Sequence, residues 1–124
     1  MAIYLKRAYE SARRSDGYRV LIDRLWPRGV TKEEARLDEW ARELGPTTAL
    51  RRWFGHDPAK FAEFRRRYRR ELAGQEEKLS ELRGRARRGT VTLVYSARDT
   101  EHNDAVVLAD VLRGSNDRDR RAGT

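Results

Sequence analysis

The sequence contains no cysteine. This absence excludes disulfide bonds, thiolate catalysis and cysteine-based zinc or iron–sulfur sites. Histidine is nearly absent too, since His56 and His102 are the only two, and two are too few for a histidine-rich metal site. A mixed site of histidine and carboxylates is the one alternative that composition leaves open, but no metal-ligand spacing occurs among the candidates. We therefore expect neither a metal nor another cofactor. The acids and histidine weighed for such a site are Asp23, Asp99, His102 and Asp104.

Long apolar runs are also missing. No stretch approaches the ~20 residues that a transmembrane helix requires, and residues 1–6 reach charge too early for a signal peptide. We therefore expect a cytoplasmic protein with no membrane partner. The 124 residues suffice for a single α/β domain with its own core, which we assign to residues 1–113. Residues 114–124 carry no large apolar side chain and are predicted to form a disordered tail.

Positive charge, in contrast, is abundant. The formal net charge is +8, and of the 28 basic residues only four are lysine while 24 are arginine. An arginine-rich, basic chain favours anionic partners such as nucleic acid or phosphorylated metabolites. The codon usage of a GC-rich genome would produce the same skew, and both explanations stay open here.

Three segments have the pattern of β-strands. Residues 3–9 alternate apolar and charged side chains, and residues 90–95 are β-branched and aromatic. Residues 18–23 contain the run Val20–Ile22, which is typical of a strand buried on both faces. Because a long helical stretch separates the second and third strands, we predict a small three-layer α/β domain. It has a short, mostly parallel sheet and a helical insertion between those two strands.

Helix starts are marked by capping residues. Thr31 and Glu34 have the form of a capping box, and the helix that they open is expected to run to about Leu44. Thr47 is expected to cap a short second helix, and Asp57 with Pro58 the third. Two further helices are predicted over residues 75–88 and 103–113, on either side of the last strand.

The end of the second strand is the most informative stretch. The apolar run ends at Asp23, and Arg24 and Arg28 then flank the Trp26-Pro27 corner. A charged turn between a buried strand and a helix start is where open α/β folds place ligand sites. Two arginines there could clamp a phosphate or a carboxylate. The alternative is that Asp23 pairs with one arginine and the charges only fix the corner.

The loop after the third strand brings a second polar group. Since parallel strands end at the same edge of a sheet, Ser96, Arg98, Asp99 and His102 should meet the first loop there. Asp99 and His102 are three positions apart, so Asp99 could orient the imidazole and His102 could act as a general base in a hydrolase. The alternative is an aspartate cap beside an exposed histidine.

One other surface could carry function. The helix that begins near Phe61 has an apolar stripe on one face and Arg65–Arg70 on the other. An arginine-rich face could follow a nucleic-acid backbone, although Glu63 and Glu71 dilute its charge. Nucleic-acid binding is therefore an alternative to binding a small anion.

Several motifs together point to a known family. The chain resembles the YeaO-like family, within domain-of-unknown-function 488, over Ile3–Leu112. The resemblance implies a compact α/β domain and no established activity. Related branches carry cysteine after the third strand, whereas this chain has Tyr95-Ser96-Ala97, so thiol chemistry does not transfer. The matching motifs are Asp16–Gly29, Trp40, Glu43–Pro46, Leu50–Pro58, Phe64, Tyr68, Glu71–Leu72, Val91–Tyr95, Asp99 and His102–Ala105.

The sequence thus predicts one crevice at the strand ends that binds a small phosphate- or carboxylate-bearing ligand. Trp53 and His56 are expected to close it from the insertion. Whether the protein is an enzyme, and its oligomeric state, are not predicted. The expected catalytic residues are His102 and Asp99, and the expected ligand-binding residues are Asp23, Arg24, Trp26, Arg28, His56 and Arg98.

Overall fold

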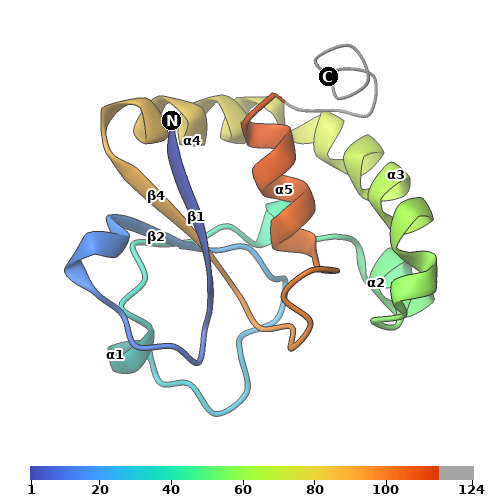
Figure 1. The fold of residues 1–124 in the computed structure, drawn as a ribbon, viewed down its shortest axis with the longest axis horizontal. Helices are drawn as coiled ribbons and strands as arrows, with labels where there is room; N and C mark the ends of the chain where they lie inside the picture. The colour runs from blue at the N-terminus through green and yellow to red at the C-terminus, as the bar shows by residue number, and fades with distance from the viewer. Residues whose placement is uncertain (115–124) are drawn as a thin grey trace.

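A computed structural model of the protein describes residues 1–114. Four parallel strands form one sheet in the order β1–β4–β2–β3 (Figure 1). The mixed α/β class and the parallel sheet confirm the prediction. Since β4 lies between β1 and β2, the last strand in the sequence is central in the sheet. The strands are β1 (Ala2–Arg7), β2 (Tyr18–Leu21), β3 (Glu39–Trp40) and β4 (Thr90–Tyr95).

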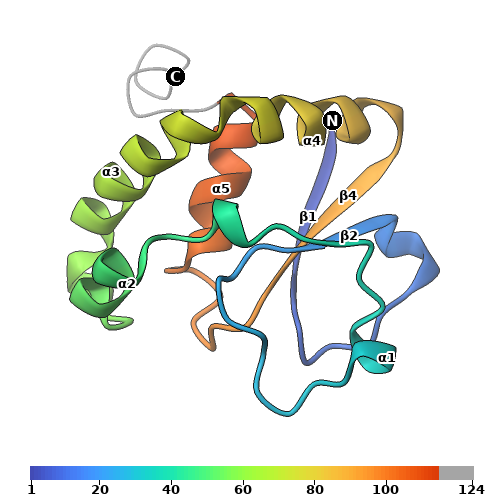
Figure 2. The same ribbon diagram turned by 180° about the vertical axis from the view of Figure 1, so that it is seen from behind.

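The helical insertion is present between β3 and β4. It contains three helices, of which α2 and α3 lie side by side at one end of the molecule, while α4 runs along the sheet (Figures 1 and 2). Helix α5 follows β4 directly and packs against β1, β4, α3 and α4. The helices are α1 (Lys32–Ala35), α2 (Thr48–Phe54), α3 (Phe61–Leu72), α4 (Glu76–Arg88) and α5 (Asp104–Leu112).

The predicted capping residues are confirmed. Thr31 Oγ1 accepts the Glu34 N–H at 3.1 Å, and Glu34 Oε1 accepts the Thr31 N–H at 2.9 Å. Thr47 caps α2 in the same way, with a 3.3 Å bond from the Leu50 N–H. Asp57 accepts the Ala59 N–H at 3.0 Å and begins the 3-10 turn Pro58–Lys60 that leads into α3.

The helix expected from Thr31 to about Leu44 is wrong beyond its first turn. Helix α1 ends after four residues because Arg36 adopts a left-handed conformation, with φ 44°. The chain then pairs with the free edge of β2, where the Asp38 N–H donates to the Arg19 carbonyl at 2.9 Å. This pairing creates β3, a strand that the sequence did not predict, and a 3-10 turn over Arg42–Leu44 follows it.

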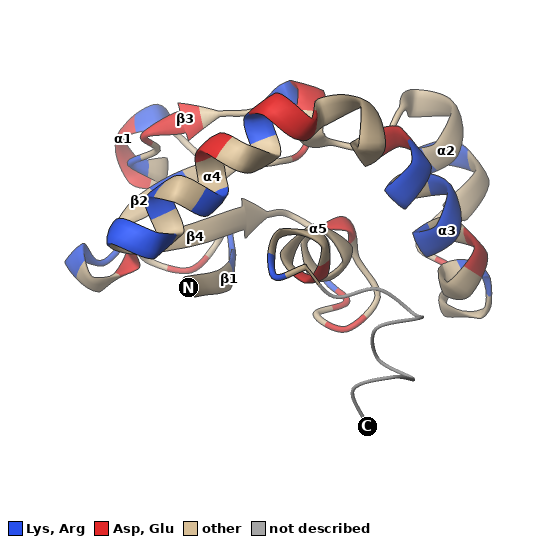
Figure 3. Ribbon diagram, turned by 90° about the horizontal axis from the view of Figure 1, so that it is seen from above, with Lys and Arg blue, Asp and Glu red and all other residues tan. Residues whose placement is uncertain are grey.

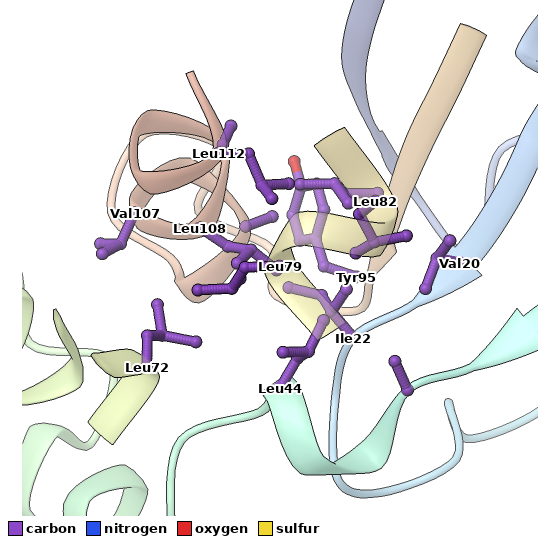
Figure 4. Packing of buried hydrophobic residues seen from close by; sticks show 14 of the residues in the cluster. Val20, Ile22, Leu44, Leu72, Leu79, Leu82, Tyr95, Val107, Leu108 and Leu112 are labelled. Carbon is purple, nitrogen blue, oxygen red and sulfur yellow. The ribbon is translucent and has the colours of Figure 1, made fainter. Parts of the chain in front are cut away.

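The main core lies between the sheet and the helices. Alternate strand residues face it, namely Val91, Leu93 and Tyr95 from β4 and Val20 from β2. Leucines of α3, α4 and α5 pack onto these side chains, as Figure 4 shows. Tyr68 is fully buried here, and its hydroxyl donates to the Leu44 carbonyl at 2.5 Å.

The opposite face of the sheet has a thin cover. Leu21 and Val94 point to this side, and Trp26, Leu37 and Trp40 pack on them. Trp26 and Leu37 come from the segment between β2 and β3, which contains only the short helix α1 (Figure 2), and Trp40 is in β3 itself. The third layer of the predicted fold is therefore a mostly irregular segment, whose Trp26 ring contacts the Trp40 ring of β3 edge to face at 5.3 Å.

Across residues 1–114, none of the helices combines the length and the apolar character that crossing a membrane would need. A disordered tail is predicted for residues 114–124. From residue 115 onward this segment lies outside the described residues.

Candidate functional site

The two polar loops meet at the carboxyl ends of β2 and β4, as predicted. The N–H and the hydroxyl of Ser96 donate to Asp23 Oδ2 at 2.9 and 2.7 Å. Arg7 of β1 fixes the same loop from the other side, through a 2.8 Å bond from Nε to the Ala97 carbonyl. Parallel pairing of β2 with β4 places both loops at one edge of the sheet, which is the reason for their contact.

A cavity of about 480 Å³ opens between these loops and α2. This volume lies within the 300–1,000 Å³ range of small-molecule sites. Five of the six predicted ligand-binding residues line it, and Arg98 does not. The lining residues are Tyr9, Asp23, Arg24, Leu25, Trp26, Pro27, Arg28, Pro46, Arg51, Phe54, His56, Phe64, Ser96, Ala97, Asn103 and Asp104.

Three arginines from two elements contribute positive charge to the cavity. Arg24 Nε is anchored by the carbonyls of Gly45 and Pro46, at 3.1 and 2.8 Å. The turn that carries Arg28 is held by the Tyr9 hydroxyl, which donates to the Arg28 carbonyl at 3.1 Å. Arg51 comes from α2, and its Nε is buried with no hydrogen-bond partner among the described residues.

None of these three guanidinium groups forms an ion pair within residues 1–114. The alternative in which Asp23 pairs with Arg24 or Arg28 is therefore not observed, and the side-chain partner of Asp23 is instead Ser96. The cavity keeps three positive groups whose charge no carboxylate neutralises directly.

The two acids of the cavity are in contact with each other. Asp104, the first residue of α5, hydrogen-bonds to Asp23, and its Oδ1 accepts the Ala105 N–H at 2.9 Å. Burial raises the pKa of Asp104 well above its usual value, and the charge of Asp23 raises it further. Asp104 therefore favours its protonated form more than an ordinary aspartate does. Three arginines and two aspartates line the cavity, so the formal charge of its lining is positive.

Aromatic and proline side chains form the apolar wall. The rings of Phe54 and Phe64 stack with centroids 4.2 Å apart. Trp26 is fixed by a 2.6 Å bond from its Nε1 to the Val30 carbonyl. His56 lies at the end of α2 with φ 57°, a left-handed conformation, and its ring tilts toward Phe54 at 6.2 Å. Trp53, expected to help close the crevice, does not line it and instead lies under Lys60 and Arg67.

The expected pairing of Asp99 with His102 is present, but outside the cavity. His102 Nδ1 lies 2.9 Å from Asp99 Oδ2, and the imidazole packs edge-on against Phe61 at 5.2 Å. The Glu101 N–H, together with His102, lowers the pKa of Asp99. Neither residue lines the cavity, so a general-base role for His102 on a ligand held there has no geometric support.

Sequence reasoning missed several lining residues. Arg51 was not singled out, because the Arg51-Arg52 pair does not reveal which side chain turns inward. Asp104 was considered only as a metal ligand, and Phe54 and Phe64 only as core residues. No group of three or more histidines and acids within residues 1–114 is arranged to hold a metal ion.

The arginine face of α3 is largely occupied by neighbouring groups. Arg65 pairs with Asp110 at 3.2 Å, and Arg66 and Arg67 both pair with Glu63. Figure 3 shows the run of basic residues on α3 with acidic segments on it and nearby. Nucleic-acid binding by this face stays a prediction that no contact favours.

Replacing Asp104 by asparagine is expected to stabilise the protein at pH 8. The pKa of Asp104 is raised in the folded state, so its contribution to stability is full below the unfolded-state pKa and is lost as pH rises toward the folded-state pKa. Asparagine removes that loss, and we expect a gain of about 1 kcal/mol at pH 8 that vanishes near pH 4. Denaturant unfolding at both pH values measures it.

The matched control is Asp99→Asn. Because the pKa of Asp99 is lowered in the folded state, this substitution should cost stability at neutral pH and little in acid. If Asp104→Asn destabilised the protein equally at all pH values, the coupling between Asp23 and Asp104 would be refuted.

Comparison with known proteins identifies relatives of this sequence. A family model described as "Inactive DUF488-N3 subclade" matches residues 2–124. The uncharacterized protein YeaO of Escherichia coli (strain K12) is 48% identical over 113 residues, which cover 91% of this chain and 98% of that protein. The uncharacterized proteins Mb3100c of Mycobacterium bovis and Rv3073c of Mycobacterium tuberculosis are each 39% identical over 112 residues, 90% of this chain and 94% of theirs. No solved structure matches.

Proposed function

Since this chain belongs to the YeaO-like proteins of the DUF488 family, and since family membership does not identify a reaction, we propose a function from the cavity itself. The cavity binds a small anionic ligand that carries a phosphate or a carboxylate group. Arg24, Arg28 and Arg51 hold the anion, and Trp26 and His56 bound it. The cytoplasmic location expected from the sequence is part of this proposal.

One observation carries the proposal. Three guanidinium groups line a single cavity, and none of them is paired with a carboxylate of residues 1–114. Placing like charges together costs free energy unless an opposite charge or solvent compensates. Arg24 and Arg28 are exposed to solvent, whereas Arg51 Nε is buried with no partner within residues 1–114. An oxyanion in the cavity supplies the opposite charge for all three groups, because guanidinium binds phosphate and carboxylate with two parallel hydrogen bonds.

Binding without turnover is the form that we favour. The matching family model is described as inactive, and His102 with Asp99 lies outside the cavity lining. The cavity itself offers a carboxyl pair and arginines, with Ser96 already donating to Asp23. A pocket of this kind recognises an anion and supplies no activated nucleophile.

Isothermal titration with n-propyl phosphate and with butyrate tests the proposal. We expect Arg28→Gln and Arg51→Gln each to weaken binding by about tenfold or more, because a hydrogen bond to a charged group contributes ~1.5–3 kcal/mol. Arg52→Gln is the matched control, since Arg52 neighbours Arg51 on α2 but is exposed and does not line the cavity. Absence of binding, or equal losses in all three variants, would contradict the proposal.

A further inference from the structure

We infer that Asp23 and Asp104 form a second subsite in the same cavity, which binds a hydroxyl group of the ligand, so that the ligand is a hydroxylated phosphomonoester such as a polyol or sugar phosphate. This inference rests on the proposed anion site. It specifies the chemical class of the ligand. It also assigns a role to Asp23 and Asp104, which anion binding alone does not explain.

The acid pair retains unused acceptor capacity. Both hydrogen bonds from Ser96 reach a single oxygen of Asp23, Oδ2, and the Ala105 N–H reaches Oδ1 of Asp104. The bond between the two carboxyl groups leaves lone pairs on the remaining oxygens, since each carboxylate offers about four acceptor sites. Both side chains line the cavity, so a donor on the ligand can reach them.

The charge of the lining selects the kind of donor. Arg24, Arg28 and Arg51 outnumber the two acids, and an ammonium group would meet net repulsion. A hydroxyl is neutral, donates one hydrogen bond and accepts others. It therefore suits the acceptor oxygens that the two acids leave unused.

The same charge balance favours a phosphomonoester over a carboxylate for the anionic end. A phosphomonoester carries about −1.5 to −2 at pH 7 and is attracted by the three arginines more strongly than a carboxylate, which carries −1. The cavity of about 480 Å³ is also far larger than one phosphate group needs. The same cavity is also lined by the acid pair and Phe54, and its volume leaves room for a carbon skeleton bearing hydroxyls.

The test compares two ligands with the same phosphate and the same three-carbon chain. Glycerol 3-phosphate carries two hydroxyls that n-propyl phosphate lacks. The apolar wall of Phe54 and Phe64 would favour n-propyl phosphate, so a preference for glycerol 3-phosphate must come from hydrogen bonds. We expect the wild-type protein to bind glycerol 3-phosphate about tenfold more tightly, as measured by isothermal titration.

The variant for this test is the double substitution Asp23→Asn/Asp104→Asn. It removes the negative charge of the lining and keeps the side-chain shapes. We expect n-propyl phosphate to bind more tightly than in the wild-type protein, while the preference for glycerol 3-phosphate falls to about twofold or less. A misfolded variant could not gain affinity for one ligand in this way. Asp99→Asn, an acid outside the cavity, should change neither affinity.

The outcomes separate the two proposals. If wild-type protein binds neither ligand, the anion site is overturned and the hydroxyl subsite with it. If wild-type protein binds both equally, or if the double variant keeps the full preference, the hydroxyl subsite is wrong and the anion site stands. The comparison in wild-type protein decides the matter even where the double variant does not fold.

Discussion

Replacing Gly17 by alanine is expected to reduce the stability of the protein by about 4 kcal/mol or more, near the top of the range for single substitutions. Gly17 precedes β2 with φ 65° and ψ −132°, a conformation that is essentially restricted to glycine. A Cβ atom there would overlap the backbone carbonyl of Thr90 and lie 2.8 Å from its Cβ. Thr90 begins the central strand β4, which cannot move without disturbing its pairing with β1.

Alanine substitutions at two other glycines distinguish the cost of backbone strain from the cost of steric overlap. Gly29 also has a positive φ, 81°, but a Cβ there meets nothing within 4 Å, so Gly29→Ala should cost only ~1–2 kcal/mol. Gly74 lies in a helical turn with open space around it, and alanine there should add about 0.5–1 kcal/mol. Thermal and urea unfolding of the three variants test this order. A Gly17→Ala protein as stable as Gly29→Ala would show that the overlap is relieved cheaply.

Most of the fold could be predicted from local patterns. The strand at Thr90–Tyr95, the capping residues and the stripe on α3 are confirmed because each depends on neighbours in sequence. The match to the DUF488 family model also confirms the resemblance that the motifs indicated. These features needed no knowledge of which segments meet in space.

The segment after α1 could not be predicted in this way. Leu37, Trp40, Ala41 and Leu44 have helical spacing, but the structure buries the first two on one face of the sheet and the last two on the other. An extended chain that crosses the sheet edge satisfies the same pattern as a helix. The edge of β2 offered backbone partners, and this pairing outweighed the local preference for helix.

The candidate site was predictable in outline. Strand ends locate Asp23 and Ser96, because parallel pairing brings such ends together. Arg51 and Asp104 were beyond prediction, since their roles depend on how α2 and α5 are placed against the loops. The i,i+3 spacing located the contact between Asp99 and His102, but the direction of the loop after Tyr95 is set by packing against Phe61.

Replacing Asp16 by asparagine is expected to cost about 3–5 kcal/mol, the range for breaking a buried ion pair on one side. Asp16 is 8% exposed and Arg19 3%. Asp16 Oδ2 accepts bonds from Arg19 Nη1 at 2.6 Å and from Lys6 Nζ at 3.1 Å. Arg19 in turn donates to the Ala35 carbonyl at 2.8 and 3.0 Å, which joins β2 to the end of α1. Asparagine would leave two cations without a counter-charge beneath the sheet.

The pKa shift of Asp16 determines how the stability loss caused by Asp16→Asn depends on pH. Burial alone would raise the pKa of Asp16, but bonds from the Arg13 N–H, Lys6 and Arg19 outweigh it, and the pKa is lowered. Asp16 therefore stabilises the folded state above its unfolded-state pKa of about 3.9, and this contribution is lost as pH falls through the lower folded-state value. The difference between wild type and Asp16→Asn should be largest at neutral pH and shrink in acid.

The control is Glu63→Gln, which also removes an acid bonded to two arginines, Arg66 and Arg67. Those arginines are exposed, and solvent replaces the lost ion pairs at little cost. Urea unfolding at pH 7 should therefore show a large loss for Asp16→Asn and a minor one for Glu63→Gln. Equal small losses would mean that water reaches Lys6 and Arg19 once the carboxylate is gone, and that the buried network does not hold α1 against the sheet.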